Sequence, residues 1–462
     1  MTSANYHNKF VAVGDDGQRI LKRSKKRTTE VAGKSSTLFE ILLAARGSLI
    51  ALCFVILLNV HFHYRTKDSL LGGMMRPKRA AVENVEPLQI TPSFTKKFED
   101  MVAGDRMTCQ PEPVVFVKTH KTGGTTITNM ILRHAERNSM LVGLPIQDHW
   151  ELAGYPVSFD QRLVDPVAPK YDVLCHHFRF NHDEIEKKMN DNAAFVTIMR
   201  NPISNYESIF GFFRDYPFAQ WVGRNGTLKN FLSNPERFYD KSTPWYFRAK
   251  NYMAYDLGFD NEDTSQEYAR YAIEEMDKIF DLVMITDRFE ESIVLLRDLL
   301  CMSDEDVIYL ALKVRRETQS TELTTDEARK IREWNSLDAS LYDHFEKKLD
   351  IAVEKFGRDK MSIEVNKLRS QLRDVEERCV DAYAQQRLTP WIRRIKLRRK
   401  SGDQCLKMTW GEVKFADHIR ELQSERTDLP PQPSYIRQHI LHHDVQRTVL
   451  GESPYIHADL ML

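Results

Sequence analysis

The most informative part of the chain reads Pro113-Val-Val-Phe-Val-Lys-Thr-His-Lys-Thr-Gly-Gly-Thr-Thr-Ile-Thr-Asn129. Its apolar residues 114–117 predict a buried strand, and residues 125–137 predict an amphipathic helix. The loop between them carries two lysines, a histidine and two glycines. A strand that turns tightly into a helix points backbone N–H groups at one spot, with the positive end of the helix dipole behind them. The stretch therefore predicts a loop that binds an anion such as phosphate.

Two other interpretations of this loop are open. The usual nucleotide-triphosphate loop is absent, because the only Gly-Lys-Ser, at Gly33 to Ser35, has Thr28 in place of the first glycine. A kinase or ATPase therefore loses its main support. The other alternative is an ordinary solvated turn. The lysines, the histidine and the helix start occur together, and this combination favours an anion site.

The loop resembles the 5′-phosphosulfate loop of Golgi sulfotransferases over Lys118-Thr-His-Lys-Thr-Gly-Gly-Thr-Thr126. Its Thr-His-Lys-Thr-Gly form is similar to the galactose 3-O-sulfotransferase family, which includes the galactosylceramide enzyme. Such enzymes use 3′-phosphoadenosine 5′-phosphosulfate (PAPS). The resemblance implies an α/β, P-loop-NTPase-like sulfotransferase fold, with a mainly parallel sheet flanked by helices. A helical C-terminal part and an N-terminal transmembrane helix complete this expectation.

A second motif follows another predicted strand, residues 194–199. It reads Arg200-Asn-Pro-Ile-Ser-Asn-Tyr-Glu-Ser208 and is similar to the family's 3′-phosphate motif. Arginine at a strand end offers a planar fork for phosphate oxygens, and Pro202 suits the first turn of a helix. Ser208, about two turns along, is expected to meet the same phosphate. The sequence departs from the family at Asn201, where aspartate is usual, so this side chain adds no charge.

Three further stretches extend the resemblance. They are Arg248-Ala-Lys-Asn-Tyr-Met-Ala-Tyr-Asp-Leu-Gly-Phe259, the segment 280–297, and Leu341-Tyr-Asp-His-Phe345. With them the resemblance covers residues 112–350 of the chain. The aromatic residues of segment 210–255 either stack on sugar faces or pack in the core, and the sequence leaves both interpretations open.

Sulfuryl transfer requires charge stabilisation on the leaving phosphate and an acceptor oxygen placed in line. The resemblance assigns Lys121 to the 5′-phosphate and the bridging oxygen, and lysines and N–H groups cover the charge without a metal. The residues expected to hold PAPS are Lys118, Thr119, Lys121, Thr122, Gly123, Gly124, Thr125 and Thr126 at its 5′ end, and Arg200 and Ser208 at its 3′-phosphate.

The acceptor hydroxyl also needs a general base, and histidine titrates in the right range. His120 lies inside the loop and is the first candidate. His176 and His177, at the end of a predicted strand, are the second, with Arg179 beside them. Ordinary packed histidines are the alternative for this pair. Zinc binding is not expected, because no cysteine or carboxylate set completes a site.

The composition suits one large or two modest domains. Of the 462 residues, 66 are Lys or Arg and 66 are Asp or Glu, so the balanced charge gives no reason to expect nucleic acid. Residues 46–63 are apolar enough to cross a bilayer if Arg46 lies at one interface. A core helix and a cleaved signal peptide are the alternatives. The sequon Asn225-Gly-Thr227 and the resemblance favour a single-pass type II Golgi membrane protein with a luminal catalytic domain.

The core is expected to alternate strands with helices, which indicates a mainly parallel sheet covered on both faces. Predicted strands are residues 114–118, 171–175, 194–199 and 282–286, and predicted helices are 125–137, 183–189, 202–213, 265–279, 288–300 and 304–315. Helical spacing in 327–356 and 361–379 predicts a lid on the sheet or a coiled coil. The expected organisation is a disordered basic cytosolic tail (1–45), a transmembrane anchor (46–63), a stem (64–110), a PAPS-binding core (111–320), a helical extension (321–425) and a polar tail (426–462).

Six cysteines occur, and one of them, Cys53, falls in the predicted membrane span. A luminal body permits disulfides, and five thiols leave at least one unpaired. The first expected pair is Cys379 with Cys405.

These observations together predict a sulfotransferase that moves a sulfuryl group from PAPS to a galactose hydroxyl, O3 in the first instance, of a glycolipid or glycoprotein glycan. A phosphotransferase that uses ATP and a non-catalytic glycan-binding membrane protein are the alternatives. The expected partners are a galactose-terminated acceptor and the Golgi membrane. A homodimer is one option for the oligomeric state, and nucleic acid is not an expected partner.

Overall fold

A computed structural model describes residues 90–104, 109–145, 151–152, 154–164, 167–310, 323–385 and 393–426. The chain divides into two units, Met1–Glu86 and Pro87–Leu462, and every described residue belongs to the second. The predicted tail 1–45 and membrane anchor 46–63 lie outside the described residues. Among the helices that the structure describes, none is both long enough and apolar enough to cross a bilayer.

The centre of the described unit is a parallel four-stranded sheet in the order β2-β1-β3-β4. Its strands are β1 (Val114–Val117), β2 (Val173–Leu174), β3 (Ala194–Met199) and β4 (Leu282–Ile285). Every strand residue is buried, as expected for a sheet covered on both faces. The predicted α/β class with a parallel sheet is confirmed.

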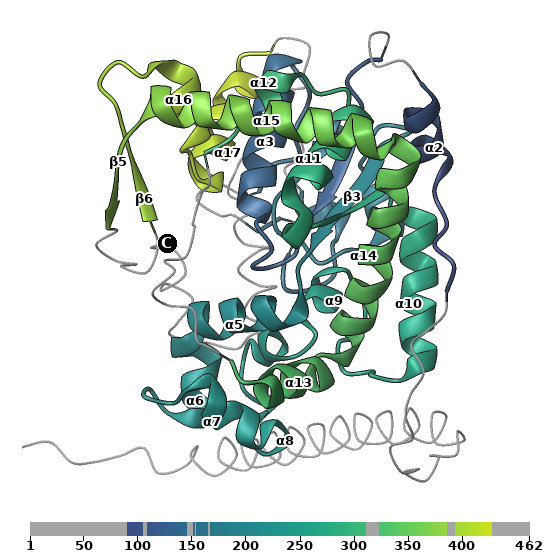
Figure 1. Ribbon diagram of the computed structural model, residues 1–462, viewed down its shortest axis with the longest axis vertical. Helices are drawn as coiled ribbons and strands as arrows, with labels where there is room; N and C mark the ends of the chain where they lie inside the picture. The colour runs from purple at the N-terminus through teal and green to yellow at the C-terminus, as the bar shows by residue number, and fades with distance from the viewer. Residues whose placement is uncertain are drawn as a thin grey trace, which may run out of the picture. The chain divides into compact units, whose positions relative to one another are not determined.

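Helices cover this sheet, and each apolar stripe faces inward. Helix α14 packs against β4 and α10, and α11 packs against β4 and α15, as Figure 1 shows. Helix α14 therefore lies against the sheet, as the lid interpretation predicts, whereas α15 packs on α11 and α14. The α-helices that the structure describes outside residues 214–249 are α2 (Lys96–Ala103), α3 (Gly124–Arg137), α4 (His182–Glu186), α5 (Pro202–Phe212), α9 (Tyr252–Asp256), α10 (Gln266–Ile279), α11 (Phe289–Leu299), α12 (Asp304–Val307), α13 (Thr325–Trp334), α14 (Ser336–Phe356), α15 (Arg358–Cys379), α16 (Gly402–Met408) and α17 (Glu412–Ser424).

The helix predicted over 327–356 is divided at Asn335. The backbone leaves the helix there because the Asn335 side chain donates to the Ile331 carbonyl, 3.0 Å away, and accepts from the Asn251 N–H, 2.8 Å away. The helix predicted over 304–315 ends at Val307. The carbonyl oxygen of Ile308, directly after this turn, accepts a hydrogen bond from Arg133 of α3 at 2.7 Å instead of one from a helix N–H.

Two features of the described unit differ from the expected organisation. Helix α2 lies in the range assigned to a stem, and its Phe98 is buried in the core. The region assigned to a helical extension contains an antiparallel hairpin, β5 (Val380–Gln385) and β6 (Arg393–Leu397), visible beside α16 in Figure 1.

The aromatic stretch builds a second core instead of a continuous sugar-binding face. Phe218, Phe231 and Trp245 are buried in one cluster, and Trp221 packs against it while partly exposed. Core packing therefore accounts for these side chains. Short helices carry them: α6 (Ala219–Val222), α7 (Leu228–Ser233), α8 (Pro235–Phe238) and the single turns Arg214–Phe218 and Tyr246–Ala249.

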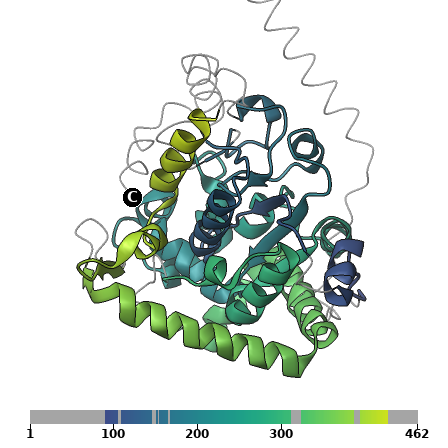
Figure 2. The ribbon, with the colours of Figure 1, turned by 90° about the horizontal axis from the view of Figure 1, so that it is seen from above.

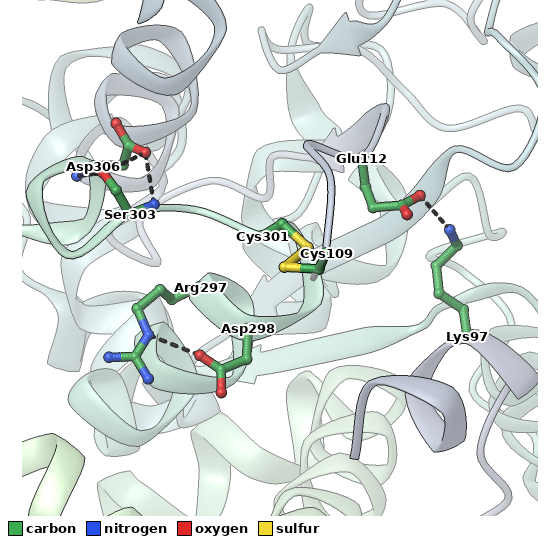
Figure 3. The surroundings of a disulfide bond; sticks show 8 residues. All are labelled: Lys97, Cys109, Glu112, Arg297, Asp298, Cys301, Ser303 and Asp306. Atoms are coloured by element: carbon green, nitrogen blue, oxygen red, sulfur yellow. Dashed lines mark hydrogen bonds and ion pairs between the residues drawn. A yellow bond between two sulfur atoms is a disulfide. The ribbon is translucent and has the colours of Figure 1, made fainter. Parts of the chain in front are cut away.

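Two disulfides join distant parts of the described unit. The predicted pair Cys379–Cys405 is confirmed and ties the end of α15 to α16. A second bond, Cys109–Cys301, ties the chain before β1 to the turn after α11 (Figure 3). Cys175, at the end of β2, is buried and free. Each bond closes a loop in the unfolded chain and so lowers its entropy.

Candidate active site

The residues singled out in the sequence gather at the carboxyl edge of the parallel sheet. The loop 118–126 follows β1, Arg200 follows β3, and Thr286 follows β4. Arg200 Nη1 donates to the carbonyl oxygen of Lys121 at 3.1 Å, and Thr286 Oγ1 donates to that of Thr122 at 2.7 Å. The two predicted anion-binding motifs therefore meet, as expected for the crevice of an open α/β sheet.

The loop has the backbone shape of an anion cradle. Lys121 and Gly123 both have left-handed conformations, with φ of 63° and 87°. Helix α3 begins at Gly124, its N-terminus has no side-chain cap, and its first turn carries no acidic residue. A Cβ atom at Gly124 would lie 2.8 Å from Lys118 Cγ, so glycine is required where the lysine side chain passes. The positive end of α3 thus remains available to a negatively charged group.

Two hydroxyls of the loop hold the loop itself. Thr119 Oγ1 donates to the carbonyl of Ile198 in β3 and lies 3.0 Å from Thr122 Oγ1. Thr122 Oγ1 donates to the Thr119 carbonyl at 3.0 Å. These bonds fix the path of the backbone, so the contribution of both threonines to an anion site comes through their N–H groups.

The two half-buried cations at the cradle are held by different partners. The Lys121 ammonium lies 3.7 Å from the centroid of the Phe212 ring, a cation–π contact. Arg200 Nε donates to Ser204 Oγ at 2.9 Å. Ser204 was not singled out in the sequence, and Ser208, the residue assigned to the 3′-phosphate, lies one turn further along α5. The i, i+4 spacing from Arg200 was the signal that could have found it. Asn201 caps α5 by accepting from the Ile203 N–H at 3.0 Å.

His120 is paired with a buried carboxylate. Its Nδ1 lies 2.8 Å from Asp256 Oδ2, and its backbone N–H donates to the same oxygen at 2.8 Å. Tyr155 donates to the other oxygen of Asp256 at 3.1 Å. Asp256 has no exposed surface, whereas the His120 side chain is 13% exposed. The carboxylate orients the ring with hydrogen on Nδ1, which leaves Nε2 as a proton acceptor.

Asp256 was also missed, although it lies within the 248–259 stretch that extended the family resemblance. Its position on α9 brings it to His120 only in three dimensions. The His120 ring is further fixed between two others, with centroids 4.1 Å from His177 and 4.4 Å from Tyr252. Burial lowers the pKa of His120 below its usual value of 6.5, although the Asp256 carboxylate acts in the opposite direction.

This pKa predicts how activity depends on pH. With the neutral ring as the predicted base, activity should be present above the pKa of His120 and fall as the pH drops through it. We expect the acid limb of kcat/KM to lie below pH 6.5. Asp256→Asn should move that limb to still lower pH, because the carboxylate raises the pKa of His120. Initial rates measured from about pH 4.5 to about pH 8 test this, and a limb above 6.5 would contradict it.

The two histidines after β2 point in different directions, as neighbours on an extended chain do. His177 joins the His120 stack. His176 is fully buried, and neither of its ring nitrogens has a hydrogen-bond partner among the described residues. Burial lowers the pKa of His176 to about 4, so the ring is neutral. Arg179 lies over the Tyr255 ring at 4.2 Å and donates to the Tyr255 and Phe259 carbonyls, so it supports α9.

Lys118 has a partner that the sequence analysis did not anticipate. Its ammonium forms a buried ion pair with Glu412, the first residue of α17. No sequence signal pointed to this residue, which lies 294 positions further along the chain. Among the described residues no group of three or more His, Cys, Asp or Glu side chains is placed to hold a metal ion.

The site carries positively charged groups at two neighbouring places. The start of α3 and Lys121 offer N–H groups and positive charge on one side, and Arg200 offers a guanidinium within contact of the same loop. His120 and Asp256 supply an oriented base next to the cradle. This combination of an anion cradle with a carboxylate-held imidazole can support transfer of a charged group to a hydroxyl.

The chain is similar in sequence to known proteins over most of its length. The family model described as Galactose-3-O-sulfotransferase matches residues 19–404. The chain is 34% identical to mouse galactose-3-O-sulfotransferase 3, over 70% of this chain and 80% of that protein. It is 30% identical to human galactosylceramide sulfotransferase, over 75% and 84% respectively. The chain therefore belongs to the galactose-3-O-sulfotransferase family.

Proposed function

We propose that this galactose sulfotransferase transfers a sulfuryl group from PAPS to O3 of a terminal galactose on a glycolipid or glycoprotein glycan. The family implies PAPS as the donor and a galactose-bearing acceptor. The observation that carries the proposal is the 3.1 Å hydrogen bond from Arg200 to the Lys121 carbonyl. It joins the two motifs expected to grip opposite ends of one donor.

The loop and Lys121 act on the 5′ end of the donor. PAPS supplies an activated sulfuryl group whose leaving group is a phosphate oxygen. The N–H groups at the start of α3 and the Lys121 ammonium stabilise the negative charge that grows on that oxygen. Lys121 reaches the site by leaving the Phe212 ring, a weak contact at a half-buried position.

His120 acts on the acceptor. Nε2 takes the proton of the galactose hydroxyl while the hydroxyl oxygen bonds to sulfur and the bond from sulfur to the phosphate oxygen breaks. Asp256 stabilises the imidazolium that results and keeps the ring in one orientation. Tyr155 and Tyr252, each 1% exposed, help to keep water from the back of the pair.

Transfer of labelled sulfate from PAPS to a panel of galactosides tests this function. The panel should include galactosylceramide, lactosyl lipids, terminal β-galactosides on N-glycans, and 3-O-methylated versions of each. We expect transfer to the free galactosides and none to the methylated ones. Transfer to the methylated sugars would exclude O3. A phosphotransferase would instead turn over ATP with magnesium, and a glycan-binding protein would show no affinity for the donor.

Arg200→Ala should weaken binding of 3′-phosphoadenosine 5′-phosphate (PAP), the product, by about 10- to 100-fold, the value of one charge-assisted hydrogen bond. The PAP affinity of Arg200→Lys should lie between those of Arg200→Ala and the unaltered protein, because lysine keeps the positive charge but lacks the planar fork. Calorimetric titration with PAP measures both. Arg358→Ala, an exposed arginine paired with Asp350 and Glu354, is the matched control and should bind PAP normally. Normal binding by Arg200→Ala would remove the 3′-phosphate assignment.

We also propose that the chain is a single-pass type II Golgi membrane protein with a luminal catalytic domain. The apolar segment 46–63 and the two disulfides support this topology. Asn225, in the sequon, is exposed in the turn before α7. Glycan at this residue, seen as an endoglycosidase-sensitive mobility shift lost in Asn225→Gln, would report a luminal domain. Protease access to the catalytic unit in intact Golgi vesicles would contradict it.

A further inference from the structure

The buried pair of Lys118 and Glu412 is the feature that the proposed mechanism leaves unused. Glu412 accepts hydrogen bonds from the Lys118 ammonium and, at 2.9 Å, from Thr125 Oγ1. The lysine side chain is 3% exposed and the glutamate 7%. These two donor residues belong to the anion cradle: Lys118 follows β1 directly, and Thr125 lies in the first turn of α3.

Such a pair is costly to bury, because both charges lose their hydration. Its value lies in the geometry that it imposes. The Lys118 side chain passes Gly124 at van der Waals distance, so its path is set on one side by the helix start and at its end by Glu412. Loss of the carboxylate would leave a buried ammonium without its ion-pair partner, and the loop would have to rearrange to hydrate it.

Glu412 itself is rigidly held, because α17 packs on α3 (Figures 1 and 2). Asn129 of α3 donates to the carbonyl of Lys407 at 2.9 Å and to that of Trp410 at 3.2 Å, directly before α17. At the far end of α17, Gln423 accepts from the Val142 N–H at 2.8 Å. The disulfide Cys379–Cys405 fixes α16 to the preceding helix. The Glu412 carboxylate is therefore held in place by a helix that is packed firmly on α3.

A second buried polar group interacts electrostatically with this pair. The charges of Glu412 and Lys118 act on the pKa of His176 in opposite directions, which places that ring near the pair. His176 is fully buried and both of its ring nitrogens lack hydrogen-bond partners among the described residues. An unpartnered buried imidazole is expensive unless a polar group reaches it when ligand is bound.

We propose that Glu412 is a positioning residue of the donor site, which holds Lys118 and Thr125 in the conformation that receives the 5′ end of PAPS. The C-terminal segment α16–α17 is therefore a structural part of the catalytic unit. This inference rests on the proposed function and extends it. It concerns a residue beyond the segment 19–404 that the family model matches.

Glu412→Gln keeps the shape of the side chain and removes its charge. We expect the KM for PAPS and the Kd for PAP to rise by about 10- to 100-fold, with a smaller change in the KM for the galactoside. Glu421→Gln, exposed on the same helix, is the matched control and should leave all three constants unchanged. Tighter PAP binding by Glu412→Gln would overturn the proposal, because the carboxylate would then compete with the donor.

A double-mutant cycle separates positioning from packing. Lys118→Met combined with Glu412→Gln removes both charges, a change that buried ion pairs often tolerate in stability. We expect the effect of Glu412→Gln on PAP affinity to vanish in the Lys118→Met background. An equal effect in both backgrounds would show that Glu412 acts independently of Lys118 and would overturn the proposal. If the unaltered protein transfers sulfate but Glu412→Gln behaves like Glu421→Gln, this inference fails and the proposed function stands. Failure of the unaltered protein to bind PAP would instead refute the function.

Discussion

His120→Ala is expected to lower kcat by about 10²- to 10⁴-fold, the usual range for a general base. The reason is that Nε2 is the only nitrogen of the ring left to accept a proton, since Nδ1 lies 2.8 Å from Asp256 Oδ2. The donor contacts come from Lys121, Arg200 and the loop backbone, so PAP affinity should remain within a few-fold of the original. Single-turnover rates and PAP titration measure the two quantities separately.

Substitution of Asp256, which positions the His120 ring, should reproduce part of this loss of kcat. Asp256→Asn leaves the histidine in place and removes the charge that stabilises its protonated form, so kcat should fall while PAP affinity is kept. His182→Ala is the control, because this histidine at the start of α4 contacts Glu186 and Phe195 instead. If His120→Ala abolished PAP binding while kcat at saturating PAPS was retained, His120 would be a structural part of the cradle and the base would have to be sought elsewhere.

Lys121→Met is expected to reduce kcat by about 10²- to 10³-fold, comparable with the loss of one preorganised donor to a developing charge. Methionine keeps an apolar side chain that can pack on the Phe212 ring, so the change removes the charge with little loss of volume. Most of the loss of activity should appear in kcat and little in KM, because the charge on the leaving oxygen is largest in the transition state.

Lys250→Met is the matched control for Lys121. Lys250 also lies over an aromatic ring, that of Trp334 at 5.0 Å, and it pairs with Glu262 away from the cradle. It should retain normal kcat and KM. Turnover of Lys121→Met at the rate of the unaltered protein would exclude Lys121 from the chemistry and leave the loop N–H groups as the main stabilisers of the leaving phosphate.

Much of the fold was readable from local patterns. Buried strands in a parallel sheet are continuous apolar runs, and those at 114–117, 194–199 and 282–285 were found within one residue of their bounds. The strand predicted at 171–175 is shorter, Val173–Leu174. The hairpin β5–β6 was missed, because its pairing joins segments whose alternation is weak in sequence.

Some residues of the candidate site could likewise be predicted from the sequence, and others could not. The loop 118–126, His120 and Arg200 carry their chemistry in adjacent residues and at strand ends, so a single sequence was enough to select them. The hydrogen bond from Arg200 to Ser204 was not predicted, because the sequence shows the spacing of a helix but not which turn a guanidinium reaches.

By itself the amino-acid sequence determined the parallel α/β core, the anion loop and the family, because each depends on short-range patterns of apolar residues, glycines and charges. Only the tertiary structure decided that Asp256 orients His120 and that Glu412 holds Lys118. Those partners lie 136 and 294 positions away along the chain. Their contacts arise from how α9 packs on α14 and how α17 packs on α3, and no local pattern encodes the distance between two packed elements.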